Sequence, residues 1–117
     1  MAKADKIEKE TFNQLVYEVV KLVPFGRVTS YGAIAKAIGY PNLSRMVGAA
    51  MSTCGMSGET VPAHRVVNAT GCLTGKESFG ASGEMQRLLE EEGIVVKNDK
   101  IKDFRKLLWN PIDEIDD

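Results

Sequence analysis

The chain has 117 residues, of which 44% are hydrophobic and 26% charged, and its net charge is −1. This length and composition fit one compact globular domain and leave little room for two. No apolar run approaches the ~20 residues of a membrane helix, and the charged N-terminus lacks the apolar core of a signal peptide. We therefore expect a monomer with a single domain over residues 1–117 and an ordered core over residues 9–110.

The charges are unevenly distributed along the chain. Residues 21–87 carry seven basic and three acidic side chains, a net of +4, whereas residues 88–117 carry five and nine, a net of −4. A basic middle permits a surface that binds a polyanion, although the whole chain is slightly acidic. A chance imbalance explains the same counts equally well, so charge alone does not identify a nucleic-acid-binding protein.

Three helices are predicted in the first half of the chain. The segment 11–14 resembles a capping box, and the apolar spacing that follows it predicts a helix over residues 11–22. Ser30 is a suitable N-cap for a second helix, and a third is predicted over residues 43–53. Two short helices joined by a tight turn are typical of a helix-turn-helix, in which the second helix contacts DNA.

The third predicted helix has an apolar stripe on one side and small residues around one arginine on the other. This second face consists of Arg45, Gly48, Ala49 and Ser52. Close packing against another part of the protein would explain the small residues, and so would close approach to a nucleic-acid backbone. The arginine among the small residues favours the second explanation.

The second half is predicted to contain a hairpin and two more helices. Segments 65–68 and 71–74 predict a short β-hairpin, which after a helix-turn-helix suggests a winged-helix arrangement. Further along we expect a loop at 74–81, a helix capped by Ser82 and ended by Gly93, an extended segment at 94–96, a turn at 97–99, a short helix around 104–109 and a frayed acidic tail at 113–117. The predicted fold is thus mostly α with a short β-hairpin.

His64, the only histidine, and Glu92 are candidates for acid–base chemistry. Glu92 follows Leu88 and Leu89 at helical spacing, so it is predicted on the buried side, where a carboxylate needs a partner to stay charged. A hydrogen bond between them would fix the imidazole tautomer, as in a Cys-His-Glu relay. Ala63 has no heteroatom, so such a relay ends at a methyl group. On spacing alone, the better explanation is structural: Glu92 extends from the helix end into solvent, and His64 is a core residue whose polar atoms are hydrogen-bonded.

Three blocks resemble the DNA-binding domain of O6-alkylguanine-DNA alkyltransferases. They are VPFGRVTSYGAIA at 23–35, SRMVGAAM at 44–51 and VPAHRVV at 61–67, followed by LLEEEG at 88–93. Order and spacing agree with the family over residues 11–109, and jointly the motifs are highly specific. The family has its acceptor cysteine between the proline and the histidine of the third block. Because Ala63 stands there, the chain is most similar to the alkyltransferase-like branch.

The resemblance implies a role for each matching residue. Tyr31 would crowd the phosphate of the target nucleotide and drive its rotation, and Arg45 would enter the duplex from the minor groove and replace the extruded base. The other residues implied at the DNA are Ser30, Gly32, Gly48, Ala49 and Ser52. The lesion pocket would be lined by Pro62, Ala63, His64, Ser78 and Phe79, with His64 and Glu92 as a supporting network.

The implied function is non-enzymatic recognition of DNA damage, without metal or cofactor. The protein would bind double-stranded DNA containing O6-alkylguanine, flip the base, and flag it for nucleotide excision repair proteins without transferring the alkyl group. We expect it in the cytoplasm, nucleoid-associated in a bacterium or nuclear in a eukaryote.

Two alternatives remain open. A winged-helix regulatory protein that flips no base would carry base-reading Arg, Asn or Gln side chains on its second helix, where only Arg45 is present. An active alkyltransferase would have to use Cys54 or Cys72. Cys54 lacks an adjacent histidine, so we expect both cysteines to be free thiols without this role.

Overall fold

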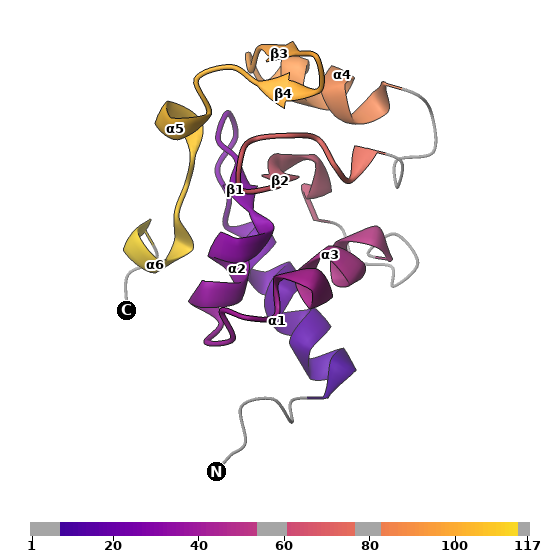
Figure 1. The fold of residues 1–117 in the computed structure, drawn as a ribbon, viewed down its shortest axis with the longest axis vertical. Helices are drawn as coiled ribbons and strands as arrows, with labels where there is room; N and C mark the ends of the chain where they lie inside the picture. Colours follow the sequence, from indigo (N-terminus) through magenta and orange to yellow (C-terminus); the bar gives the residue numbers. More distant parts are fainter. Residues whose placement is uncertain (1–7, 54–60, 77–82, 115–117) are drawn as a thin grey trace.

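A computed structural model describes residues 8–53, 61–76 and 83–114. Its elements in chain order are α1 (Lys9–Lys21), β1 (Thr29–Ser30), α2 (Tyr31–Ala37), α3 (Ser44–Ser52), a 3-10 turn (Ala63–Arg65), β2 (Val66–Val67), α4 (Glu84–Glu91), β3 (Val96–Lys97), β4 (Lys100–Ile101), α5 (Phe104–Leu107) and α6 (Pro111–Glu114) (Figure 1). The fold is mostly helical with short strands, as predicted. No helix within the described ranges has the length and apolarity needed to cross a membrane.

The three predicted helices of the first half are confirmed as α1, α2 and α3. The Ser30 hydroxyl accepts a hydrogen bond from the Ala33 N–H at 3.1 Å, so the predicted N-cap of α2 is present. The predicted capping box at 11–14 is wrong, because α1 begins at Lys9. Glu10 lies in this earlier first turn, where a negative charge interacts favourably with the helix dipole.

Helices α1, α2 and α3 share one hydrophobic cluster. Phe12 and Val16 of α1 are fully buried, and Val47 of α3 faces them as its apolar spacing predicts. The Tyr17 hydroxyl donates a hydrogen bond of 2.9 Å to the Ala50 carbonyl oxygen, which joins α1 to α3. The position of α3 is therefore set by both packing and a directed bond.

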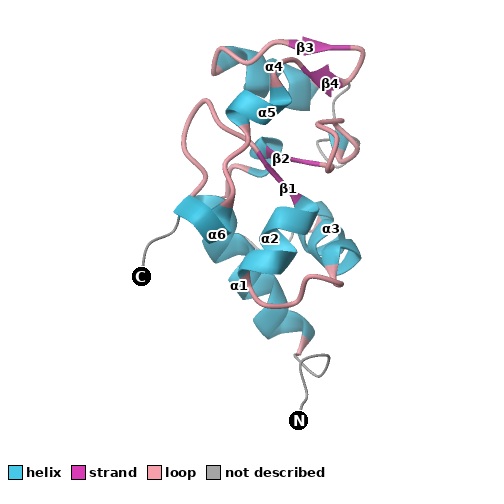
Figure 2. Ribbon diagram, turned by 60° about the vertical axis from the view of Figure 1, so that its left-hand side comes forward, coloured by secondary structure: helices cyan, strands magenta, loops and turns pink. Residues whose placement is uncertain are grey.

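A second hydrophobic cluster lies beneath α4, β3 and β4. Strand β2 separates the two clusters, because Val66 packs with the helix-turn-helix while Val67 packs with the second cluster. Figure 2 shows β1 and β2 in the middle of the molecule, between α1, α2, α3 and α6 on one side and α4, α5, β3 and β4 on the other. Tyr31 directly follows β1 and Ala63 lies just before β2, so both are positioned at this boundary.

The hairpin predicted from segments 65–68 and 71–74 is wrong in its pairing. Strand β2 pairs in parallel with β1, with Val66 opposite Thr29 and Val67 opposite Ser30. Both valines are buried, at 1% and 0% exposure, which fits a strand covered on two faces rather than one face of a hairpin.

The hairpin of this fold lies later in the chain, between β3 and β4. Asn98 and Asp99 connect these strands with φ angles of 55° and 60°, and two positive values are the signature of a type I′ turn. The predicted extended segment and turn are thus confirmed as part of a hairpin.

The remaining predictions for the second half are confirmed in part. Helix α4 is present, with Gly83 immediately before it, and Ser82 lies outside the described residues. The short helix expected around 104–109 is α5. Part of the acidic tail expected to fray is helical, because Asp113 and Glu114 belong to α6.

Candidate nucleic-acid interface

The Glu92 carboxylate is the centre of a buried polar network. Its side chain is 5% exposed, and its Oε2 atom lies 2.6 Å from His64 Nε2 and 2.8 Å from Arg65 Nη2. Its Oε1 atom accepts a hydrogen bond of 2.7 Å from the Gly26 N–H. The predicted bond between Glu92 and His64 is therefore present, and Glu92 does not extend into solvent.

Burial alone would raise the pKa of Glu92, but the hydrogen bonds from Arg65, the Gly26 N–H and His64 outweigh it and hold this pKa below its ordinary value of 4.5. Glu92 is therefore a carboxylate at neutral pH, and the nearby His64 Nε2 atom carries the proton of the bond. This bond therefore fixes the orientation of the imidazole through its Nε2–H.

Sequence reasoning missed the role of Arg65 in this network. Besides Glu92, its guanidinium donates a hydrogen bond of 2.8 Å to the Val23 carbonyl oxygen and lies 5.8 Å from the centre of the Phe25 ring. The signal was present, because Arg65 directly follows His64 within the motif. Its charge was counted in the basic middle of the chain, whereas its side chain is only 15% exposed and is paired internally.

The outer face of α3 is open. Arg45, Ala49 and Ser52 are exposed, and Gly48 is half-buried. A Cβ atom added at Gly48 would meet no heavy atom of the described chain within 4 Å. Packing against another described element is therefore not the reason for the glycine, and this favours the second explanation, close approach to a nucleic-acid backbone.

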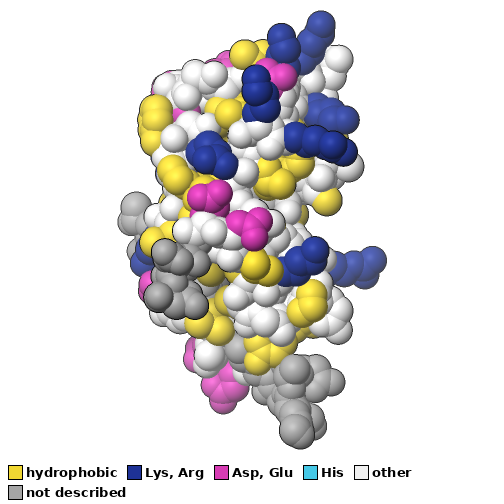
Figure 3. All heavy atoms as spheres, turned by 90° about the vertical axis from the view of Figure 1, so that its left-hand side faces the viewer, with side chains coloured by type: hydrophobic (Ala, Val, Ile, Leu, Met, Phe, Trp, Pro, Cys, Tyr) yellow, Lys and Arg dark blue, Asp and Glu magenta, His cyan; other side chains and the backbone are white. Residues whose placement is uncertain are grey.

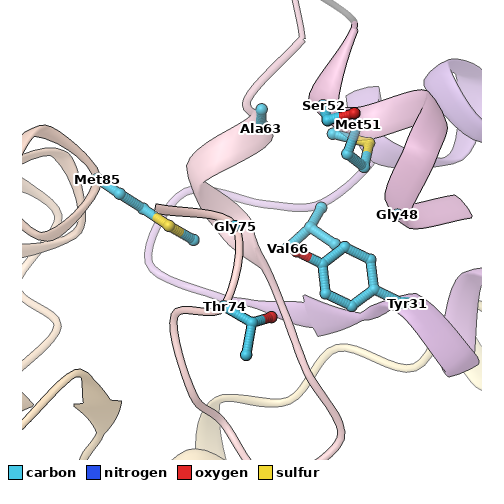
Figure 4. A pocket seen from close by; sticks show the side chains of 9 residues that line it. All are labelled: Tyr31, Gly48, Met51, Ser52, Ala63, Val66, Thr74, Gly75 and Met85. Carbon is cyan, nitrogen blue, oxygen red and sulfur yellow. The ribbon is translucent and has the colours of Figure 1, made fainter. Parts of the chain in front are cut away.

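A pocket of about 280 Å³ lies beside this face (Figure 4). Its wall combines α2, α3, the segment around β2 and α4, through Tyr31, Gly48, Met51, Ser52, Ala63, Val66, Thr74, Gly75 and Met85. Figure 4 shows the Tyr31 ring directed toward the segment that carries Thr74 and Gly75, with Met85 on the opposite side. The open face of α3 therefore leads into a cavity that reaches the Ala63 methyl group.

Of the five residues predicted to line a lesion pocket, Ala63 does so. Pro62 and His64 are half-buried and are not among its lining residues, and Ser78 and Phe79 lie outside the described residues. The structure adds five lining residues that sequence reasoning missed, Met51, Val66, Thr74, Gly75 and Met85. These small or apolar residues come from α3, β2, the segment after β2 and α4, which are distant in sequence and meet only in the folded chain.

Five of the seven residues expected at DNA divide into two groups. Tyr31, Gly48 and Ser52 line the pocket, and Arg45 and Ala49 lie on the exposed face beside it. Gly32 resembles Gly48, since an added Cβ would meet nothing within 4 Å in the described chain. Ser30 differs, because its side chain is buried and its hydroxyl caps α2.

Basic side chains also gather away from α3. Figure 3 shows Lys and Arg side chains over the end of the molecule that holds β3, β4 and α5. The exposed basic residues of these elements and their connections are Lys97, Lys100, Lys102, Arg105 and Lys106. The structure thus concentrates positive charge that the net charge of −1 conceals.

No group of three or more potential metal-binding side chains occurs in ranges 8–53, 61–76 and 83–114.

The fold and this geometry define a helix-turn-helix DNA-binding domain with a pocket beside its second helix. Residues 11–94 match the model of the 6-O-methylguanine DNA methyltransferase DNA-binding domain. The chain belongs to this family.

Relatives in the family are similar over most of the chain. Alkyltransferase-like protein 1 of Schizosaccharomyces pombe is 32% identical over 107 residues, which cover 87% of this chain and 97% of the relative. The DNA base-flipping protein of Escherichia coli is 38% identical over 109 residues, covering 91% and 81%. Proteins named methylated-DNA–protein-cysteine methyltransferase also match, so the family comprises both kinds of protein.

A crystal structure of S. pombe Atl1 with damaged DNA containing O6-carboxymethylguanine superposes with a TM-score of 0.73. The two sequences are 33% identical, and the match covers 90% of this chain and all of that one. The fold described above is therefore the fold of an alkyltransferase-like protein.

We predict that Glu92→Gln lowers the free energy of unfolding at neutral pH by about 3 kcal/mol, because removing the charge from a buried ion pair leaves Arg65 without its counter-charge. The pKa of Glu92 is lower in the folded protein than its ordinary value of 4.5. The ionised side chain therefore contributes its full stabilisation to the fold above pH 4.5, and this contribution is lost as the pH falls through the folded pKa. The difference between wild type and variant should therefore shrink below pH 4.5, as measured by urea denaturation across pH.

Glu90→Gln is the matched control, since Glu90 lies on the same helix but is exposed. It should change the free energy of unfolding little at any pH. A Glu92→Gln penalty that stays constant from neutral pH to well below pH 4.5 would contradict the ionised, hydrogen-bonded state of Glu92.

We further predict that Gly48→Ala raises the free energy of unfolding by up to about 1 kcal/mol, because alanine is the better helix former and its Cβ meets no described atom. Gly48→Leu should also fold but should weaken binding to duplex DNA by about tenfold or more, since a bulky side chain blocks close approach. Gln14→Leu on the exposed side of α1 is the control in the same fluorescence-anisotropy titration. Unchanged binding of Gly48→Leu would remove α3 from the interface.

Proposed function

We propose that this protein recognises O6-alkylguanine in double-stranded DNA by flipping the base into the pocket and holding it there, without transferring the alkyl group. The observation that carries the proposal is the continuity between the open face of α3 and the pocket that reaches Ala63. Relatives named alkyltransferase-like protein and DNA base-flipping protein support it, as does the S. pombe complex with damaged DNA.

Entry of a base into this pocket requires a force on the DNA and a replacement for the lost stacking. Tyr31 stands in the pocket wall at the start of α2, where it can press on the phosphate of the target nucleotide. Arg45 is exposed on α3, where it can enter the duplex from the minor groove. Flipping costs a few kcal/mol, which the inserted arginine and the phosphate contacts offset.

The same geometry argues against alkyl transfer. Ala63 presents only a methyl group to the pocket, so a base held there meets no nucleophile at this position. Cys72 is a free thiol, but it is not among the lining residues. Cys54 lies outside the described residues. Incubation with a duplex containing O6-methylguanine should therefore leave the mass of the protein unchanged.

The output of such a protein is the stable complex itself. A base that is gripped and not repaired blocks direct repair at that site, and we propose that the complex flags the lesion for nucleotide excision repair proteins. This role places the protein wherever the cell keeps its DNA, in the cytoplasm of a bacterium or the nucleus of a eukaryote.

The test is a binding titration of a duplex with one O6-methylguanine against the matching unmodified duplex, at one fixed salt concentration. We expect tighter binding of the modified duplex. Comparable affinity for both would remove damage recognition and leave a winged-helix DNA-binding protein that flips no base. A gain of one methyl group in mass would instead identify an active alkyltransferase.

We predict that Arg45→Ala lowers the preference for the modified duplex by about tenfold or more, because the energy of unstacking is then no longer offset by the inserted side chain. Arg105→Ala, an exposed arginine on α5, removes the same charge elsewhere and should leave the preference unchanged. If both variants weaken binding of the modified and unmodified duplexes equally, Arg45 contributes charge only and does not replace the base.

A further inference from the structure

Gly75 lies so close to the Tyr31 hydroxyl that a side chain at position 75 would require one of the two to shift. A Cβ atom built on Gly75 would lie 2.7 Å from the Tyr31 hydroxyl oxygen, and this oxygen is the only described heavy atom within 4 Å apart from Gly75 and its chain neighbours. Both residues line the pocket, and Figure 4 shows the tyrosine ring directed toward this segment. The tip of Tyr31 thus occupies the space that a side chain at position 75 would need.

The backbone of Gly75 does not itself require glycine. Gly71 and Gly83 have φ angles of 87° and 80°, where other residues are strained, whereas Gly75 is not among the glycines with positive φ. Alanine at position 75 is therefore compatible with the local chain conformation. The one steric conflict that alanine at position 75 would create with the described residues is its contact with the Tyr31 hydroxyl.

We propose that Gly75 is a positioning residue, whose missing side chain fixes where the Tyr31 hydroxyl stands at the pocket. This inference rests on the proposed function, because it gives the position of Tyr31 a consequence for base flipping. The start of α2 is held by the Ser30 cap and by the pairing of β1 with β2. A contact shorter than 3.0 Å therefore displaces the mobile end of Tyr31, which is the end that would meet the phosphate.

The test is a double-mutant cycle of Gly75→Ala and Tyr31→Phe, with the preference for the O6-methylguanine duplex as the readout. Gly75→Ala should lower this preference by about three- to tenfold, within the range of coupling between residues in contact. Phenylalanine lacks the oxygen that the new Cβ would meet, so Gly75→Ala should cause no further loss in the Tyr31→Phe protein. Urea denaturation should show all three variants folded.

A second readout needs no DNA. The protein contains three tyrosines, Tyr17, Tyr31 and Tyr40, so fluorotyrosine labelling gives three fluorine resonances in the NMR spectrum. Gly75→Ala should shift the Tyr31 resonance and leave the other two in place, since no other described atom lies near the added Cβ.

The two readouts separate the possible failures. An unmoved Tyr31 resonance, or an equal loss of preference in the Tyr31 and Phe backgrounds, overturns the positioning role of Gly75. A wild-type protein with no preference for the modified duplex overturns the proposed function, while a shifted Tyr31 resonance would still support the contact between the two residues.

Discussion

The buried carboxylate of Glu92 joins three parts of the chain that are distant in sequence. Glu92 caps the C-terminal end of α4. Its carboxylate accepts a hydrogen bond from the Gly26 N–H in the loop after α1, and it binds His64 and Arg65 in the 3-10 turn. A buried charge is tolerated only while its donors stay in place, so this network fixes the segments relative to one another. The position of Ala63, next to His64, depends on that arrangement.

The network explains how a binding site can persist without a nucleophile. In a relay with cysteine, a carboxylate–imidazole pair has acid–base work to do. Here the residue that precedes His64 is Ala63, and the hydrogen bonds of the pair hold the 3-10 turn that carries this part of the pocket wall. Structural and functional explanations of His64 and Glu92 are therefore compatible, because the structural role sets the shape of the cavity into which α3 opens.

The sequence predicted the parts of the fold that depend on local patterns. Apolar spacing and the Ser30 cap located the first three helices. The helical position of Glu92 predicted that it lies on the buried side, and the family resemblance favoured its bond to His64. Pairing between distant strands leaves no local signal, so the strand predicted to pair with Val66–Val67 was wrong, and the actual partner is Thr29–Ser30. Thr74, Gly75 and Met85 were missed for the same reason, since small and apolar residues acquire a role only through tertiary placement.

The central claim is that a flipped guanine lies against Ala63. The most direct measurement uses Ala63→Cys and a duplex whose guanine carries a disulfide-terminated tether on O6, so that thiol–disulfide exchange with a cysteine at the pocket wall crosslinks the two. We predict a crosslinked product far above that of the wild type, which retains Cys54 and Cys72 as background. Transfer of the tether itself to the introduced cysteine, seen as a gain in protein mass, would equally place the guanine at this position. A variant that binds this duplex as tightly as the wild type but neither crosslinks more nor gains the mass of the tether would contradict the claim.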